Sequence, residues 1–333
     1  MEKLIYVDDS LPGITRRGAG KGFAYYMPEG DLIRDRAVRR RLNAIALPPA
    51  YRDAWFCPAE NGHILATGYD DAGRKQYRYH PEFRLMREGS KFDRCEAFGR
   101  LLPLVRKRVA DDLAQSAPTM TRTLASAVHL LDLTSIRIGS EQYTRRNESY
   151  GATTLRSEHV EVAEDSVALH FTGKGGRDRQ MAVESAPLAK AVEKMADLGG
   201  DHIFQFEDED GQTRAITADD VNSYLRETMG EDITAKNFRT WHGSVLAFER
   251  LAMAKDDVRI SDLLDLVSDH LGNTPATARK SYIHPAVIAK VETQSEWRAS
   301  LRLPRATRWL SRSERGLITL IEESPQAADL LAA

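Results

Sequence analysis

Short apolar runs separated by turn residues dominate residues 3–79. The runs are LIYV, FAYY, AWF, HILATGY and KQYRY, and clusters of Gly, Pro and Asp lie between them. Runs of this length with such boundaries are typical of β-strands. One helical pattern, over 35–46, interrupts the series. The pattern predicts a small β-rich N-terminal domain, residues 1–84.

Apolar positions recur every three or four residues in the rest of the chain, which is typical of helices packed on a core. The spacing is seen at Leu124, Val128 and Leu131, at Leu188, Val192 and Met195, and at Val221 and Leu225. A Thr217/Asp220 pair predicts the start of one helix and Gly230 its end. We expect a polar linker at 85–90 and a mainly helical domain at 91–333, with a helical, surface-packed tail after Pro285.

A β-hairpin is predicted among these helices. Residues 160–167, 169–171 and 180–183 are rich in β-branched and apolar side chains, and the glycine-rich turn 172–178 lies between them. Lys174 stands at the tip, flanked by glycines. The predicted fold class is therefore α+β: a small β-rich domain followed by a larger helical domain with an inserted hairpin.

Composition narrows the possible functions. The 333 residues are 42% hydrophobic, which is enough for two domains with their own cores. A net charge of −2 means that any nucleic-acid-binding surface must be local. The two cysteines are far apart and the nine histidines lack metal-ligand spacing, which argues against a disulfide scaffold and a zinc finger. With no signal peptide or membrane span in the sequence, we expect a cytoplasmic protein.

Two residues near predicted turns are suited to binding a phosphate. Arg137 follows apolar Leu133 and Ile136 and precedes Gly139, so it is expected at an irregular point near a helix end. The alternative is a surface arginine paired with Glu141. The glycines beside Lys174 would let the hairpin tip press against a ligand. The alternative there is an ordinary solvated lysine.

A third candidate is the pair Lys236 and Arg239, three residues apart on one helix face. Adjacent like charges destabilise a helix unless an anion neutralises them, so the pair favours a phosphate-binding role. Thr234 is expected to cap this helix. His242 could join the pair, although a histidine beside Trp241 is more often packed.

The fourth candidate site surrounds Tyr282. A helix is predicted to end at Gly272, followed by Asn273 and then by a short helix that starts at Pro275 and carries Tyr282. Without further information, Tyr282 would equally suit a half-buried anchor for that helix.

In their order along the chain, these residues resemble the catalytic set of type IB DNA topoisomerases of the compact poxvirus and bacterial kind. That set is an Arg, a hairpin Lys, a second Arg within K-x-x-R, a His or Asn, and a Tyr nucleophile. The matching positions here are Arg137, Lys174, Lys236 with Arg239, Asn273 and Tyr282. Asn273 replaces the histidine of many members, which leaves a hydrogen-bond donor without a titratable proton.

The resemblance extends to the small domain and implies DNA contacts. The segment GHILATGYDDAGRKQYRYH is similar to the family's DNA-contacting hairpin, and strand alternation places Tyr77 and Tyr79 on one face. A core aromatic pair is the alternative. The residues implied to contact DNA are Arg74, Gln76, Tyr77, Tyr79, Gly139 and Tyr143.

The resemblance implies an isomerase that relaxes supercoiled duplex DNA. Tyr282 would form a 3′-phosphotyrosyl intermediate, with no ATP, metal or other cofactor, in a nucleoid-associated monomer without an obligatory protein partner. A tyrosine recombinase and a non-catalytic DNA-binding protein remain alternatives. Lys236, where recombinases usually have His, and the β-rich domain argue against the first. The five matched catalytic positions argue against the second.

Overall fold

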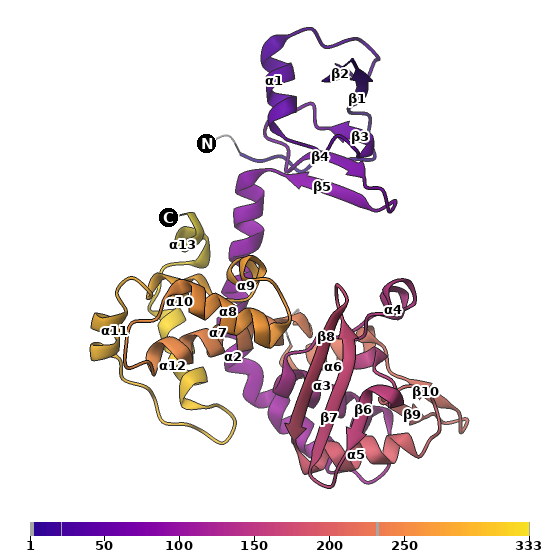
Figure 1. Cartoon of the computed structure of the whole chain (residues 1–333), viewed down its shortest axis with the longest axis vertical. Helices are drawn as coiled ribbons and strands as arrows, with labels where there is room; N and C mark the ends of the chain where they lie inside the picture. The colour runs from indigo at the N-terminus through magenta and orange to yellow at the C-terminus, as the bar shows by residue number, and fades with distance from the viewer. Residues whose placement is uncertain (1–2, 21, 231–232, 333) are drawn as a thin grey trace. The chain divides into compact units, whose positions relative to one another are not determined.

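The chain divides into two compact units, Met1–Gly89 and Ser90–Leu331. The computed structural model describes residues 3–20, 22–230 and 233–332. Helix α2 (Pro81–Leu113) runs through the division, and the segment expected to form a linker, 85–90, is part of this helix (Figure 1).

The N-terminal unit is an antiparallel five-stranded sheet with one helix. The strand order is β2-β1-β3-β4-β5. The elements are β1 (Ile14–Ala19), β2 (Gly22–Tyr26), α1 (Arg36–Ala44), β3 (Arg52–Phe56), β4 (Ile64–Tyr69) and β5 (Lys75–Tyr79). Leu42 of α1 packs in one core with Ile14, Tyr25 and Phe56 of the sheet. The predicted β-rich domain and its helix are confirmed.

Two details of the sheet differ from the prediction. The run LIYV is not a strand, because only Ile5 forms an isolated bridge, to Gly62. Strand β1 was not predicted, since Ile14 is its only buried residue and most of its other side chains are exposed. Backbone pairing with β2 and β3 holds β1 in place, and such pairing leaves no apolar alternation in the sequence.

The second unit is mainly helical and contains the predicted hairpin. Strands β7 (Ser166–Gly173) and β8 (Arg177–Glu184) pair antiparallel, and β6 (Val160–Val162) completes a three-stranded sheet. The other strands, β9 (Gln205–Glu207) and β10 (Thr213–Ala215), form a separate pair, and η1 (Ala152–Thr154) and η2 (Ser157–His159) are 3₁₀ helices. The helices as far as the candidate site are α3 (Met120–Thr134), α4 (Glu141–Asn147), α5 (Ala186–Ala196), α6 (Ala218–Met229), α7 (Lys236–Ala252), α8 (Ile260–Leu271) and α9 (Pro275–Ser281).

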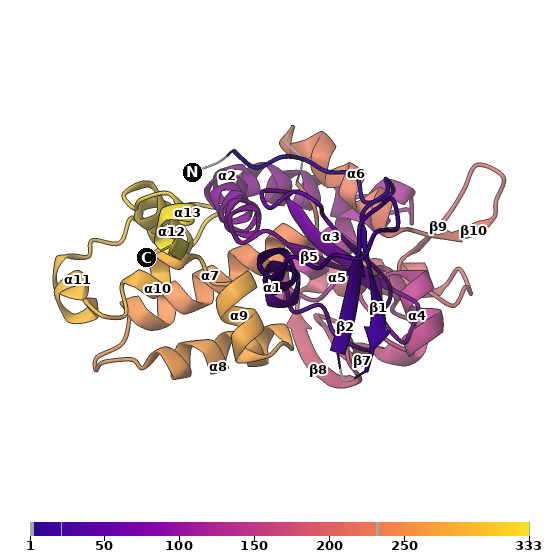
Figure 2. The same cartoon turned by 90° about the horizontal axis from the view of Figure 1, so that it is seen from above.

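The predicted boundaries of α6 and the predicted end of α8 agree with the structure. Thr217 and Asp220 form a capping box at the start of α6, and Gly230 ends that helix with φ +65°. Gly272 ends α8 with φ +60°. Within this unit, both views place α8, α10 and α11 on one side and the β6–β8 sheet on the other (Figures 1 and 2). No helix in the described part of the chain is long and apolar enough to span a membrane.

The C-terminal tail belongs to the core of the second unit, so its prediction as a surface-packed segment is wrong. It forms α10 (Pro285–Ala289), α11 (Gln294–Ser300), α12 (Arg312–Glu322) and α13 (Ala327–Ala332). Leu317 is fully buried, and the Gly316 backbone lies against the Phe248 ring. The alternation of charged and apolar residues in the tail suggested a surface segment. One of the charged residues, Glu314, is in fact buried.

Glu314 joins the tail to a buried ionic network. Arg106 donates from Nε to Asp132 (2.7 Å) and from Nη2 to Glu314 (2.8 Å), and Trp241 Nε1 also donates to Glu314. His242 contacts the same network through Asp132, at 2.8 Å. Burial opposes ionisation of Asp132, but His242 and Arg106 hold its pKa well below the usual range. The network therefore connects α2, α3, α7 and α12.

Glu314→Gln is expected to lower the free energy of unfolding by about 3 kcal/mol, because breaking a buried ion pair leaves an incompletely compensated charge. Denaturant titration would measure the change. Glu323→Gln, on an exposed residue just after the same helix, should stay within about 0.5 kcal/mol of the parent. Equal losses in the two variants would contradict a stabilising role for the network.

Candidate active site

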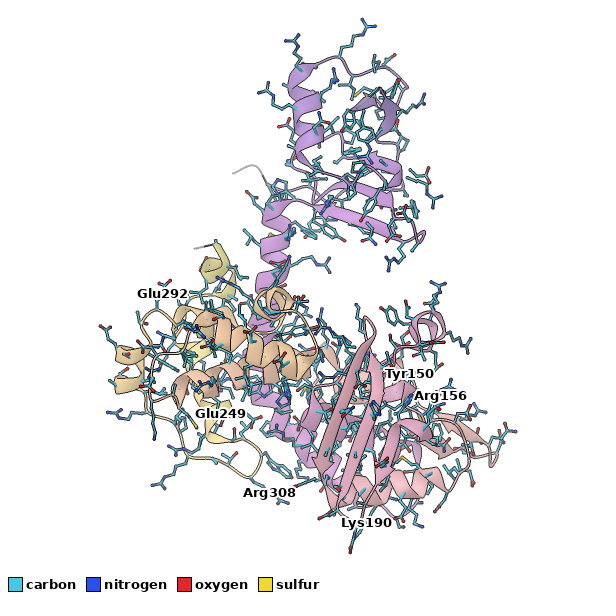
Figure 3. The ribbon with its side chains drawn as sticks, in the orientation of Figure 1. Tyr150, Arg156, Lys190, Glu249, Glu292 and Arg308 are labelled. Atoms are coloured by element: carbon cyan, nitrogen blue, oxygen red, sulfur yellow. The ribbon has the colours of Figure 1, made fainter. Side chains whose placement is uncertain are left out.

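A pocket of about 430 Å³ in the second unit brings together most of the predicted catalytic residues. Its lining includes Arg137, Lys174, Lys236, Arg239 and Tyr282, and also Gly139 and Tyr143. Tyr150, labelled in Figure 3, lines the same pocket. The remaining candidate, Asn273, adjoins it because its Oδ1 accepts a hydrogen bond from Arg137.

Arg137 lies in an irregular segment just after α3, as predicted. Main-chain hydrogen bonds hold this segment, from Ala152 N to Arg137 O (2.8 Å) and from Thr153 N to Ile138 O (2.7 Å). Gly151 permits the close approach, because a Cβ there would lie 2.5 Å from Arg137 O. The alternative partner, Glu141, pairs with His202 instead. Hydrogen bonds thus fix the backbone that carries Arg137, and the Glu141 carboxylate does not pair with its guanidinium.

Lys174 is exposed at the tip of the β7–β8 hairpin. Gly175 and Gly176 follow it with φ of +80° and +72°, values that favour glycine. Its Nζ lies 5.8 Å from the centroid of the Tyr143 ring. The ammonium group therefore faces the pocket from a turn whose backbone conformation favours glycine.

Arg239 is buried (3% exposed) and fixes two other parts of the site. It donates from Nη1 to the carbonyl of Ser135 and from Nη2 to that of Leu271, at 2.8 Å. Those carbonyls lie two residues before Arg137 and Asn273, respectively. Burial and the charge of Arg137 lower the pKa of Arg239 to about 10. One guanidinium thus anchors both neighbouring candidates.

Helix α7 differs from the prediction at its start and at His242. Thr234 does not cap the helix; the Asn237 side chain instead accepts hydrogen bonds from the Thr234 amide and hydroxyl. Lys236 is exposed one turn before Arg239 and lines the pocket. His242 points to Asp132 rather than into the pocket, so the packed alternative is the correct one.

Tyr282 follows α9 directly and is 9% exposed. The Arg239 Cζ atom lies 5.0 Å from the centroid of its ring. Burial alone would raise the pKa of the phenol, but Arg239, Arg137 and Lys236 outweigh it and lower the pKa below its ordinary value of about 10. The cations around the ring thus favour ionisation of the phenol.

Two small residues of α7 contact the backbone of Tyr282 and hold it in place. A Cβ on Gly243 would lie 2.8 Å from Tyr282 O, and Ser244 Oγ donates to the same carbonyl at 3.1 Å. Sequence reasoning missed both residues. The available signal was a Gly-Ser pair within a helix, where glycine usually indicates close packing.

Asn273 carries an unsatisfied donor. Its Nδ2 is buried and has no hydrogen-bond partner among the described residues, while Oδ1 is occupied by Arg137. Buried donors normally find a partner, so an amide next to this pocket is suited to donate to a bound anion such as a phosphate oxygen. Within the described ranges, no group of three or more His, Cys, Asp or Glu residues could hold a metal ion.

The predicted contacts of the N-terminal unit lie on the edge strand β5, except Arg74, which directly precedes it. Tyr77 and Tyr79 stack with ring centroids 5.6 Å apart and an interplanar angle of 6°, which confirms that they share a face. Tyr77 is 40% exposed, so this is not a core pair. Asp70 accepts from Arg74 Nε (2.9 Å) and Gln76 Nε2 (3.0 Å). The strand thus presents a preorganised aromatic and polar surface.

The comparisons with known proteins agree with this architecture and site. The family model of the eukaryotic DNA topoisomerase I catalytic core matches residues 80–296, more than half of the chain. That of the bacterial DNA topoisomerase IB N-terminal domain matches residues 22–70. The chain therefore belongs to the type IB DNA topoisomerase family and is an enzyme of that type.

Individual relatives cover much of the chain. DNA topoisomerase 1B of Acanthamoeba polyphaga mimivirus is 29% identical over 284 residues, 84% of each protein. DNA topoisomerase 1B of Vaccinia virus (strain Copenhagen) is 23% identical over 239 residues, 70% of this chain and 74% of the viral protein. A structure of the XerH site-specific recombinase bound to palindromic difH substrate is 17% identical, with a TM-score of 0.37 over 65% of this chain and 51% of the recombinase. This TM-score is too low to indicate a relationship between the two proteins.

Proposed function

We propose that this enzyme relaxes supercoiled duplex DNA by cutting and rejoining one strand through a 3′-phosphotyrosyl intermediate, without ATP or a metal ion. The observation that carries the proposal is the position of Tyr282, in one pocket with Arg137, Lys174, Lys236 and Arg239. A phosphodiester there would meet a nucleophile, charge-neutralising groups and proton donors together.

In the proposed reaction, Tyr282 Oη attacks the scissile phosphorus while the bond from phosphorus to the 5′ oxygen breaks. The phenol loses its proton to solvent, and does so more readily because the nearby cations lower its pKa. Arg137, Arg239 and the free Nδ2 of Asn273 stabilise the non-bridging oxygens. Lys174 protonates the leaving 5′ oxygen, with Lys236 as a supporting donor.

Religation is the reverse of cleavage. The 5′ hydroxyl attacks the phosphotyrosyl phosphorus, and the tyrosine leaves. Because a tyrosyl phosphodiester replaces a DNA phosphodiester, the two steps need no external energy source. Strand rotation between them would remove supercoils.

We also propose that residues 1–84 form a DNA-binding domain that contacts the duplex through β5. Tyr77 and Tyr79 would supply flat apolar surface, and Arg74 and Gln76 would supply donors to phosphates or base edges. Gly139 and Tyr143 would contact DNA beside the scissile phosphate, since both line the pocket.

Incubation of the purified protein with supercoiled plasmid in EDTA, without ATP, tests the proposed function. Relaxed topoisomers are expected. Plasmid that stays supercoiled under several salt concentrations would contradict relaxation. Recombined rather than relaxed products would favour a tyrosine recombinase.

The pH dependence of cleavage is expected to follow the ionisation of Tyr282. On a substrate whose leaving 5′ oxygen is replaced by sulfur, no acid is needed, so the rate should rise with pH as the phenol ionises, with its midpoint below the ordinary phenol pKa of about 10. Arg239→Gln removes the cation nearest the phenol, which raises its pKa and moves the rise to higher pH. Single-turnover cleavage across a pH series measures this. Lys190→Gln, on exposed residue Lys190 of α5 (Figure 3), is the control and should leave the profile unchanged. An unshifted profile for Arg239→Gln would contradict the proposed electrostatic role.

A further inference from the structure

The side chain of Arg179 lies between two glycines that directly precede proposed catalytic residues. A Cβ on Gly173, next to Lys174, would lie 3.1 Å from Arg179 Cγ. A Cβ on Gly272, next to Asn273, would lie 2.8 Å from Arg179 Nη1. The absence of a side chain at both glycines thus leaves room for Arg179 between the hairpin and the end of α8.

Hydrogen bonds fix Arg179 in this position. It donates from Nη1 to Asp269 O (3.0 Å) and from Nη2 to His270 O (2.7 Å). These carbonyls belong to the last turn of α8, where main-chain acceptors lack helical partners and a cation is favoured by the helix dipole. A single planar guanidinium therefore caps α8 and joins it to β8.

Arg177 adds a second connection from the same face of β8. Its Nη1 donates to the carbonyl of Asn273 at 2.7 Å. Arg177 pairs with Gly173 across the hairpin, so it lies directly beside the tip that carries Lys174. Two arginines thus attach one hairpin strand to three carbonyls, those of Asp269 and His270 in the last turn of α8 and that of Asn273 just after it.

The charges of these arginines are otherwise uncompensated. No carboxylate among the described residues forms an ion pair with Arg177 or Arg179, while the neighbouring Asp178 contacts His170. Burial lowers the pKa of Arg179, and Arg137 and Arg177 lower it further. Like charges this close together repel one another, and a bound anion would offset that repulsion.

We propose that Arg179, supported by Arg177, is a positioning residue that locks the Lys174 hairpin onto the α8–α9 turn, so that the Lys174 ammonium is held at the leaving 5′ oxygen. The proposal rests on the proposed function, since it assumes that Lys174 is the acid. Arg179 does not line the pocket and acts through Lys174. A displacement of the ammonium by about 1 Å would be enough to cost about 100-fold in rate.

The test compares two leaving groups with one protein sample. Arg179→Met keeps the length and apolar stem of the side chain but removes its donors. Single-turnover cleavage should fall at least about tenfold on ordinary DNA and recover most of that loss on DNA with a sulfur leaving group, because sulfur leaves without an acid. The ratio of the two rates does not depend on how much of the sample is folded.

Three further variants extend the comparison. Arg179→Lys keeps the charge but cannot present a fork to two carbonyls, so it should show the same sulfur-dependent recovery. Gln180→Met changes the next residue, which is exposed, and should leave both rates at the parent level. Addition of Arg179→Met to a Lys174→Ala variant should cause little additional loss on ordinary DNA.

Equal losses on both substrates, or no loss on either, would overturn the positioning role. Failure of the proposed function has a different signature: the unmodified enzyme would then not cleave either substrate. A parent enzyme that cleaves both, together with an Arg179→Met variant without selective recovery, would reject the positioning proposal alone.

Discussion

Tyr282→Phe should bind duplex DNA about as well as the parent enzyme and form no covalent adduct. The substitution keeps the ring, its contact with Arg239 and the backbone bond to Ser244, and it removes only the attacking oxygen. Since no other step can begin without the bond to phosphorus, plasmid relaxation should fall below detection.

The measurement is the yield of protein-linked 3′ ends on a labelled duplex, with a gel-shift titration for affinity. Tyr224→Phe provides a matched control in the same unit. Tyr224 is also buried, but its hydroxyl donates to Asp112 and it does not line the pocket. That variant should form adduct normally. A parental adduct yield from Tyr282→Phe would mean that another residue attacks.

Local features of the site were predictable from the sequence because local chemistry determines them. The Lys174 turn follows from three glycines, and the end of α8 follows from Gly272. Arg137 was expected outside a helix because of its neighbours, and it lies just past the end of α3 at Thr134. In each case, residues within a few positions determine the backbone conformation.

Long-range contacts were not predictable in this way. Arg239 was expected to share one helix face with Lys236; its burial and its hydrogen bonds to the carbonyls of Ser135 and Leu271 were not expected. Every residue has a main-chain carbonyl, so the sequence does not indicate which carbonyls will accept these hydrogen bonds. The same holds for the α8 carbonyls that accept from Arg179. In the tail, nothing in the sequence near Glu314 indicates that it forms a buried ion pair.

Lys174→Ala should slow cleavage of ordinary DNA by about 10²–10⁴-fold, the usual effect of losing a general acid. The leaving 5′ oxygen then departs as an unprotonated alkoxide. On DNA with sulfur at that position, the variant should approach the parent rate, because a thiolate leaves without a proton. Lys174 is exposed at a turn, so its removal leaves the packing of β7 and β8 unchanged.

Arg137→Ala and Arg239→Ala provide the comparison that separates acid catalysis from charge stabilisation. Both guanidiniums are expected to act on non-bridging oxygens, so sulfur should restore less activity to these variants than to Lys174→Ala. Some recovery in Arg137→Ala would indicate that Arg137 relays the proton. If Lys174→Ala is equally impaired on both substrates, Lys174 is not the acid, and Lys236→Ala becomes the variant in which sulfur should restore cleavage, since Lys236 is the other lysine lining the pocket in the described part of the chain.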